Sequence, residues 1–409
     1  MTDGGEGGDD TRMDADAGDA DRAVTGEAPV DAALGAEGVA GRFRAWSDRL
    51  TSEERYVTAA VGAFAGLLVV MVLGGVITDA YMMNLLALAG MYILLSMGLN
   101  VQWGYTGLIN FSVAAFFGVG AYAAAVLASP DSPVTQGTLL VVTPPGMGPV
   151  DLLGTPVAGV FAALLVTAVI AVLFGIPTLS LREDYLAIAS LGLAEVIRLI
   201  IKNEGAWTGG VQGILGMPEF FVEWPVIGGF VAEVPAPHMN AVVALVFVLA
   251  TWLVLRRIHR SPWGRAQRLV RSDEDLAEAL GKDTYSLRMQ SFVIGSVIMG
   301  LAGVLFVHIN NSLFPGTLKP ITTFYVWIAV ILGGSGSDRG AIIGGIVVVT
   351  IIQGTRFVSG AVPFIDSGSM RLLIVGLVII LIMHGRQQGV LPPQRELIWP
   401  GATGGEPNE

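Results

Sequence analysis

The chain has 409 residues, of which 53% are hydrophobic and 14% charged, and its formal net charge is -11. Soluble domains carry about 25% charged residues, so this composition indicates a protein embedded in lipid. The sequence has no cysteine, which excludes disulfides, thiolate metal sites and a cysteine nucleophile, and its 4 histidines lack the spacing of metal ligands.

The segment before Tyr56 is rich in Gly, Ala and Asp and holds much of the acidic charge. It cannot bury enough apolar surface to fold, so we expect residues 1–55 to form a disordered acidic cytoplasmic tail. Of the 23 basic residues only three are lysine. Together with the acidic tail, this bias resembles the proteins of salt-loving organisms.

Long apolar runs follow the tail, and a bilayer core needs about 20 mostly apolar residues per helix. The runs that meet or approach this length are 57–78, 81–101, 108–128, 157–179, 185–201, 238–258, 291–311, 340–357 and 371–384. A shorter run, 323–333, is either a tilted span or a half-helix that re-enters the membrane. We predict an all-α, polytopic transmembrane helix bundle over 56–385, with about ten spans, or nine if 323–333 is re-entrant.

The loops between these runs differ in basic charge, and Lys and Arg concentrate in cytoplasmic loops. The longest basic stretch is 256–290, so we place its soluble part, 259–290, in the cytoplasm. Alternation then puts the loop 129–156, which has no Lys or Arg, outside. It puts both the N-terminal tail and a short C-terminal tail, 386–409, inside. An even span count and a multi-pass protein of the cell membrane follow.

The first polar cluster lies around the join of the second and third runs. Its candidate residues for a substrate path are Asn100, Gln102, Asn110 and Ser112. Polar groups at membrane depth are costly, so each requires a reason. Two interpretations fit: the side chains line the path of a solute, or they form a turn and hydrogen-bond between helices.

Two further candidate sites lie near the fifth run. Glu195 and Arg198 are three residues apart, hence neighbours on one helix face. They either form a structural ion pair or line the path and bind a zwitterionic amino acid. Thr208, Gly209 and Gly210 belong to an outer stretch that is either a mouth for solute entry or an ordinary flexible loop.

The basic cytoplasmic loop contains a short amphipathic helix. Ser261 and Pro262 predict one helix start, Ser272 a second, and Gly281 a left-handed end. The predicted ATPase-coupling helix comprises Asp273, Glu274, Asp275, Leu276, Ala277, Glu278, Ala279, Leu280 and Gly281. Such a helix suits insertion into a groove on a partner protein. The alternative is a helix lying on the membrane surface, which acidic residues disfavour.

Several blocks resemble one family. "GLNVQWGYTGLINFSVAAFFGVGAYAAAVL" at 98–127, the stretch 181–214, "FVIGSVIMGLAGVL" at 292–305 and "VILGGSGSDRGAIIGG" at 330–345 are similar, in order, to LivM-type branched-chain amino acid permeases. "EDLAEALG" at 274–281 resembles the cytoplasmic coupling loop of ATP-binding-cassette importers.

The resemblance implies the permease subunit of an importer for branched-chain amino acids that works by alternating access. Its implied partners are a second homologous permease subunit, two cytoplasmic ATPase subunits, an extracytoplasmic amino-acid-binding protein and the lipid bilayer, and no nucleic acid. Gly281-Lys282 is followed by Asp283, so the chain lacks the phosphate-binding GxxxxGK[ST] motif. We therefore expect no enzyme activity, no cofactor and no metal in this chain.

Two alternatives remain open. A permease of the same superfamily for urea, short amides or another small polar solute would have the same hydropathy. An ion-coupled secondary transporter usually has buried acidic residues for its coupling ion and no ATPase-docking helix.

Overall fold

The computed structural model describes residues 52–75, 77–129, 141–142, 150–151, 156–218 and 233–359, with isolated positions at 132, 220 and between 373 and 391. The predicted tail up to residue 51, most of the loop 129–156, most of the run 371–384 and nearly all of 386–409 lie outside the described residues.

Helices make up most of the described chain. They are α2 (Ser52–Leu73), α3 (Asp79–Leu99), α4 (Val113–Ala128), α5 (Pro156–Thr178), α6 (Glu183–Asn203), α7 (Gly205–Thr208), α9 (Ala236–His259), α10 (Pro262–Ser272), α11 (Glu274–Ala279), α12 (Thr284–Asn310), α13 (Pro320–Gly333) and α14 (Asp338–Ser359). A π-helix, η1 (Asn100–Tyr105), continues α3, and η3 (Gly210–Gln212) and η4 (Pro315–Thr317) are 3-10 turns. The strands form two antiparallel pairs, β1 (Val141–Val142) with β2 (Val150–Asp151) and β3 (Ile214–Leu215) with β4 (Ser312–Leu313).

The predicted all-α fold is confirmed, because each apolar run between 57 and 357 coincides with a helix. Within the described ranges, 6 stretches are long and apolar enough to cross a membrane: Asp79–Tyr105, Pro156–Thr178, Ala236–His259, Thr284–Asn310, Pro315–Gly333 and Asp338–Thr355. The short run 323–333 lies within the fifth of these. α4 is shorter than its run because Gly107 has φ +83° and the Asn110 side chain accepts a bond from the Ser112 N–H, which keeps 107–112 non-helical.

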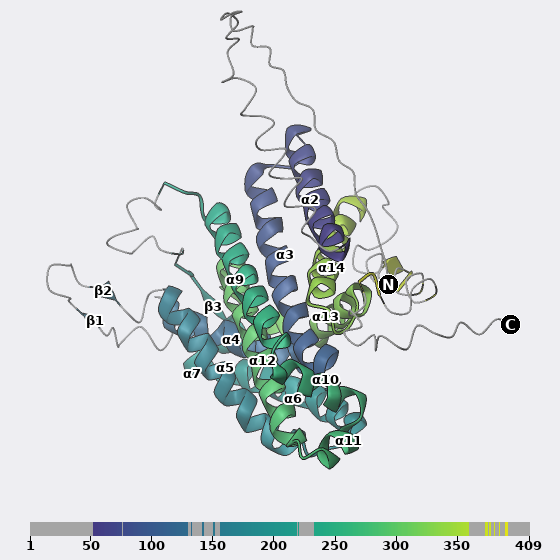
Figure 1. Cartoon of the computed structure of the whole chain (residues 1–409). Helices are drawn as coiled ribbons and strands as arrows, with labels where there is room; N and C mark the ends of the chain where they lie inside the picture. The colour runs from purple at the N-terminus through teal and green to yellow at the C-terminus, as the bar shows by residue number, and fades with distance from the viewer. Residues whose placement is uncertain are drawn as a thin grey trace, which may run out of the picture. The chain divides into compact units, whose positions relative to one another are not determined.

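The described helices from α3 to α14 form a bundle with two ends. At each end, contacts between segments far apart in the sequence hold the helices together. At one end, Asn100 and His259 both bond to Asp338, beside α10 and α11. At the other, β3 pairs with β4, and the Met217 N–H donates to the Asn311 side chain over 2.6 Å. We call these the α10–α11 end and the β3–β4 end; Figure 1 shows α10 and α11 together at the lower end of the view.

α12 lies at the centre of the packing, against α3, α4 and α5. Glycines allow its close approach to its neighbours. A Cβ added to Gly98 on α3 would lie 2.7 Å from the Gly295 carbonyl oxygen, and one on Gly120 would collide with the Gly300 backbone. Small residues of this kind let membrane helices associate through van der Waals contact and hydrogen bonds, since apolar burial gives no advantage in lipid.

The outer faces of α5 and α9 are apolar without interruption. Their exposed large side chains are Phe161, Leu165, Val166, Val169, Val172, Leu173 and Ile176 on α5 and Val242, Leu245, Val246, Leu249, Leu253 and Val254 on α9. Patches of this extent are rare on soluble monomers. Lipid acyl chains are the environment that such faces require.

Candidate functional site

The α10–α11 segment begins where its sequence indicates. Pro262 occupies the first turn of α10, with Ser261 as the preceding residue. Gly281 has φ +73° and ends α11, as expected of a left-handed cap. One detail of the prediction is wrong: the side chain that caps α11 belongs to Asp273, which accepts from the Leu276 N–H over 2.9 Å, whereas the Ser272 hydroxyl donates back to the Leu269 carbonyl. Asp273 adopts the extended backbone that a cap needs, and Ser272 is still helical.

The two sides of α11 differ. One side is fixed to α12: Glu274 accepts from Arg288 over 2.9 Å, Glu278 accepts from the Thr284 hydroxyl over 2.8 Å, and Ala277 is fully buried. The other side is apolar and faces outward, with Leu276 48% and Leu280 62% exposed. The segment is therefore a rigidly mounted helix with an uncovered apolar face.

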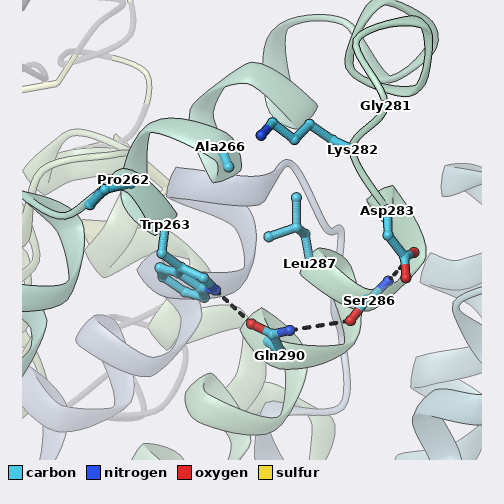
Figure 2. Close-up of a pocket in the computed structure, with 9 residues that line it drawn as sticks. All are labelled: Pro262, Trp263, Ala266, Gly281, Lys282, Asp283, Ser286, Leu287 and Gln290. Carbon is cyan, nitrogen blue, oxygen red and sulfur yellow. Dashed lines mark hydrogen bonds between the residues drawn. The ribbon is translucent and has the colours of Figure 1, made fainter.

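A surface pocket of about 390 Å³ adjoins α11. Its lining residues are Pro262, Trp263, Ala266, Gly281, Lys282, Asp283, Ser286, Leu287 and Gln290, shown in Figure 2. The Trp263 indole N–H donates to the Gln290 Oε1 over 2.7 Å, and the Gln290 Nε2 donates to the Ser286 hydroxyl over 3.2 Å. These bonds fix α10 to the first turns of α12 and leave a concave surface beside Leu280.

The candidate path residues Gln102, Asn110 and Ser112 form one buried network. The Gln102 Nε2 donates to the Phe292 carbonyl over 2.8 Å and to the Ser296 hydroxyl over 3.1 Å. The Gln102 Oε1 accepts from the Asn110 Nδ2 over 2.7 Å, and the Asn110 Oδ1 accepts from the Ser112 N–H and hydroxyl. The network crosslinks η1, the start of α4 and the middle of α12.

Asn100 belongs to a second buried network, which the sequence analysis did not identify. Its Nδ2 donates to an oxygen of Asp338 over 3.3 Å, and its Oδ1 accepts from the Gly336 N–H over 2.8 Å. The other Asp338 oxygen lies 2.9 Å from the Nδ1 of His259, whose ring stacks on Tyr105 with centroids 3.5 Å apart. Asp338 and His259 thus join the ends of α3, α9 and α14.

α10 contacts η1 and Thr106, which belongs to the first polar cluster of the sequence, through two side chains that the sequence analysis missed, Arg271 and Gln267. The Arg271 guanidinium donates to the Gly104 carbonyl and, over 3.2 Å, to the Ser335 hydroxyl. Desolvation lowers the pKa of Arg271 from its ordinary value, although part of the side chain reaches solvent. The Thr106 hydroxyl bonds to Gln267 of α10 and lies 2.6 Å from the Ser291 hydroxyl. The sequence signal for these contacts was the predicted topology, which places the basic loop with Gln267 and Arg271 on the same side as the join between the second and third apolar runs.

Glu195 and Arg198 form the ion pair expected from their spacing. The Arg198 Nε lies 2.8 Å from a Glu195 carboxylate oxygen, and a second bond completes a bidentate contact. The pair lies on the outer side of α6, with the two side chains 42% and 22% exposed. It is not part of either buried network.

Thr208, Gly209 and Gly210 lie towards the β3–β4 end. The Thr208 hydroxyl lies 2.6 Å from the carbonyl oxygens of Ile201 and Glu204, and Gly209 and Gly210 have φ +72° and +55°. A short turn, η3, then leads into β3, which pairs with β4. The structure therefore separates the candidate path residues into three groups: the α10–α11 end, the outer side of α6 and the β3–β4 end. Among the described residues, no three His, Asp or Glu side chains gather as a metal site.

Comparisons with known proteins agree with one another. The family model described as "Branched-chain amino acid transport system / permease component" matches residues 81–383. The permease protein LivM of the high-affinity branched-chain amino acid transport system of Escherichia coli is 30% identical, covering 76% of this chain and 70% of its own. A probable LivM of Methanocaldococcus jannaschii is 26% identical, and the match covers 76% of this chain and 93% of that protein. The Escherichia coli LivH permease is 27% identical, and the match covers 73% of this chain and 92% of that protein. No solved structure matches the chain.

Proposed function

We propose a transport function from the premise that this chain belongs to the family of branched-chain amino acid transport permease components. It is the membrane-spanning subunit of an ATP-driven importer, takes up branched-chain amino acids and alternates between outward- and inward-open states. Its partners are a second, homologous permease, two cytoplasmic ATPase subunits and an extracytoplasmic binding protein. The family match, which spans most of the described helices, is the observation that carries this proposal.

We further propose ten spans, with both tails and the α10–α11 end in the cytoplasm. The basic charge of 256–290 and the joining of two ends by successive helices support this arrangement. The stretch Pro315–Gly333 supports counting 323–333 within a span. β4, just before it, belongs to the β3–β4 end, and the bonds of Gly336 and Asp338, just after it, belong to the α10–α11 end.

The helix α11 is the proposed contact with the ATPase. Its outward face offers Leu276, Ala279 and Leu280 to a groove, and its inner face is fixed to α12 by Glu274 and Glu278. A helix that inserts an apolar face into a groove transmits force only if its base is rigid, and these bonds supply that rigidity. The adjoining pocket beside Trp263 gives the partner a second point of contact.

Movement of α11 reaches the spans through two routes in this proposal. Arg271 and Gln267 connect α10 to η1, where α3 changes from α- to π-helix. Asp338 connects α9 to α14. Because π-helical turns often mark functional sites within helices, η1 is the element most suited to change between the two states.

The substrate path in this proposal includes Glu195 and Arg198, which match the amine and carboxylate of a zwitterionic amino acid. Asn100, Gln102, Asn110 and Ser112 form its inner gate, and Thr208, Gly209 and Gly210 its outer mouth. Urea or a short amide lacks the opposite charges that such a pair would bind. An ion-coupled transporter would need a free acidic residue, whereas Glu195 is paired.

Replacing both Glu195 and Arg198 by leucine should abolish uptake of radiolabelled leucine and leave assembly intact. Normal uptake by this double variant would remove the pair from the substrate path.

The test of coupling uses Ala277→Pro and Leu280→Glu in the complex purified with its native subunits. Proline removes the Ala277 N–H that bonds to Asp273, and glutamate places a charge on the exposed apolar face without a buried neighbour to disturb. Both variants should insert normally but lose ATP-dependent uptake, and Leu280→Met should retain it. Full uptake by Leu280→Glu would contradict the docking of α11.

A further inference from the structure

The outer side of α6 differs from the apolar outer faces of α5 and α9 described above. α6 has 21 residues, enough for a span of about 30 Å. Yet it carries Glu195 and Arg198 away from its ends, whereas α9 exposes an arginine, Arg257, only in its last turn and α5 has no charged residue. Of these three helices, α6 is the one whose composition is too polar for a face in contact with lipid.

The charges away from the ends of α6 belong to the ion pair between Glu195 and Arg198. Glu195 is 42% exposed and Arg198 22%, and the pair lies past the middle of α6, which the proposed ten-span arrangement places within the bilayer. A charged pair at this depth requires protein or a water-filled cavity around it rather than acyl chains. This chain by itself supplies only part of that environment.

A glycine one turn earlier provides an independent observation. Gly192 is exposed, and a Cβ added there would meet no atom within 4 Å. Inside the bundle, by contrast, Gly98, Gly120 and Gly295 each mark a place where another helix touches the backbone. Glycine weakens a helix interior, so its presence in α6 is explained if a helix of another chain packs closely there.

We propose that the α6 face, defined as Ile188, Gly192, Glu195, Arg198 and Leu199, is the surface on which the second permease subunit packs. This inference rests on the proposed function. Soluble ATPase and binding-protein subunits cannot reach the middle of a span, so the occupant is itself a membrane protein. In Escherichia coli two different permeases of one transport system, LivM and LivH, both resemble this chain, which makes a homologous permease the appropriate partner.

The inference also specifies where substrate passes. A path at the α6 face would lie between the two permeases, with Glu195 and Arg198 accessible to substrate from the junction rather than from the interior of one chain. The glycine contact and the ion pair then have separate roles. Gly192 sets the distance between the subunits, and the pair faces the space that they enclose.

Photocrosslinking from single cysteines tests the surface, because the native chain has none. Ile188→Cys and Leu199→Cys place the probe on the α6 face, and Leu165→Cys on α5 and Leu245→Cys on α9 are controls; the four native side chains are 71%, 42%, 67% and 58% exposed. Each variant is labelled in its native membrane with a benzophenone maleimide and irradiated, and the adducts are identified by mass spectrometry. The unsubstituted chain reports labelling of other subunits.

We expect the α6 positions to give several-fold more adduct with a homologous permease than the α5 and α9 positions. Equal adducts from all four positions, lipid adducts only, or adducts only with a second copy of this chain would overturn the inference. Gly192→Leu provides a second measurement: it should reduce the recovery of the partner permease and leave the melting temperature of the separated chain unchanged. Unchanged recovery would contradict close packing at Gly192.

The outcomes separate this inference from the proposed function. A complex that contains an ATPase but gives no α6 adducts would leave the importer intact and refute the surface. Permease adducts from α6 in a complex without any ATPase would support the surface and refute ATP-driven transport.

Discussion

The α10–α11 end and the α6 face differ in the bonding and the exposure of their polar side chains. At the α10–α11 end, Gln102, Asn110 and Asp338 are bonded within the chain and largely shielded from solvent. On the α6 face, Glu195 and Arg198 bond to each other and remain partly exposed. Polar residues inside apolar helices therefore fall into two groups here: some complete the fold of this chain, and we infer that the α6 pair is completed by a partner. The variants below test that distinction, and those expected to perturb the protein most come first.

Matched glycine substitutions should give the largest contrast. Gly295→Leu would force a side chain against the Gly98 carbonyl and Gln102, and overpacking costs about 1–3 kcal/mol or more, so we expect little folded protein. Gly192→Leu meets open space and should leave the isolated chain as stable as the parent. The stability of both variants is measured by the yield of monodisperse protein and by the melting temperature in detergent. Similar losses for the two variants would contradict the contrast.

Removing polar side chains should separate the two regions next. Gln102→Leu leaves the Asn110 amide without its acceptor and the Ser296 hydroxyl without its donor, at about 1–3 kcal/mol for each buried group left unpaired. The double variant Glu195→Leu and Arg198→Leu removes an exposed pair worth about 0–1 kcal/mol. Thermal unfolding of the purified chain should therefore show a clear loss for the first and little change for the second. A double variant as unstable as Gln102→Leu would mean that the α6 pair supports the fold.

Arg271→Met should have a moderate effect on stability and a larger one on coupling. It removes the bonds from α10 to Gly104 and Ser335, each worth about 1 kcal/mol net. We expect ATP hydrolysis by the complex to continue while uptake per ATP falls. Arg265→Met, on the exposed part of α10, is the control and should keep the parental ratio of uptake to ATP hydrolysis. Equal ratios for the two variants would exclude Arg271 from the transmission route.

Glu274→Gln should have the smallest effect. The carboxylate is 40% exposed, and its ion pair with Arg288 is worth about 0–1 kcal/mol. Because α11 is also held by the Glu278 bond and the buried Ala277, uptake should fall by no more than a small factor. A complete loss of uptake with normal ATPase association would show that this single bond carries the force from α11.

The fold was predictable where it depends on the local sequence. Apolar runs fix the helices because lipid requires long apolar segments with internally bonded backbones. Pro262 and Gly281 fix the start of α10 and the end of α11 through their restricted or permissive backbone angles. The start of α4 was missed because the Asx turn at Asn110 competes with the helix, which hydropathy does not detect.

The site was predictable only in part, for a related reason. The spacing of Glu195 and Arg198 indicates their ion pair, since both lie on one helix. Asp338 and His259 are 79 positions apart, and their contact depends on how α9 and α14 pack, which no local pattern encodes. The same is true of Arg271 and Gly104. The basic charge of the loops predicts which helix ends lie on the same side of the membrane. It does not predict which side chains at those ends contact one another.

The orientation of α11 is tested most directly by the accessibility of Glu278→Cys, the sole thiol in the variant chain, at a solvent-exposed position of this helix. A membrane-impermeant maleimide is applied to right-side-out vesicles and to inverted vesicles, with and without their peripheral subunits. Labelling only in inverted vesicles, and less when the ATPase subunits are bound, is the expected result. Labelling in right-side-out vesicles would place α11 outside the cell and contradict the transport mechanism proposed here.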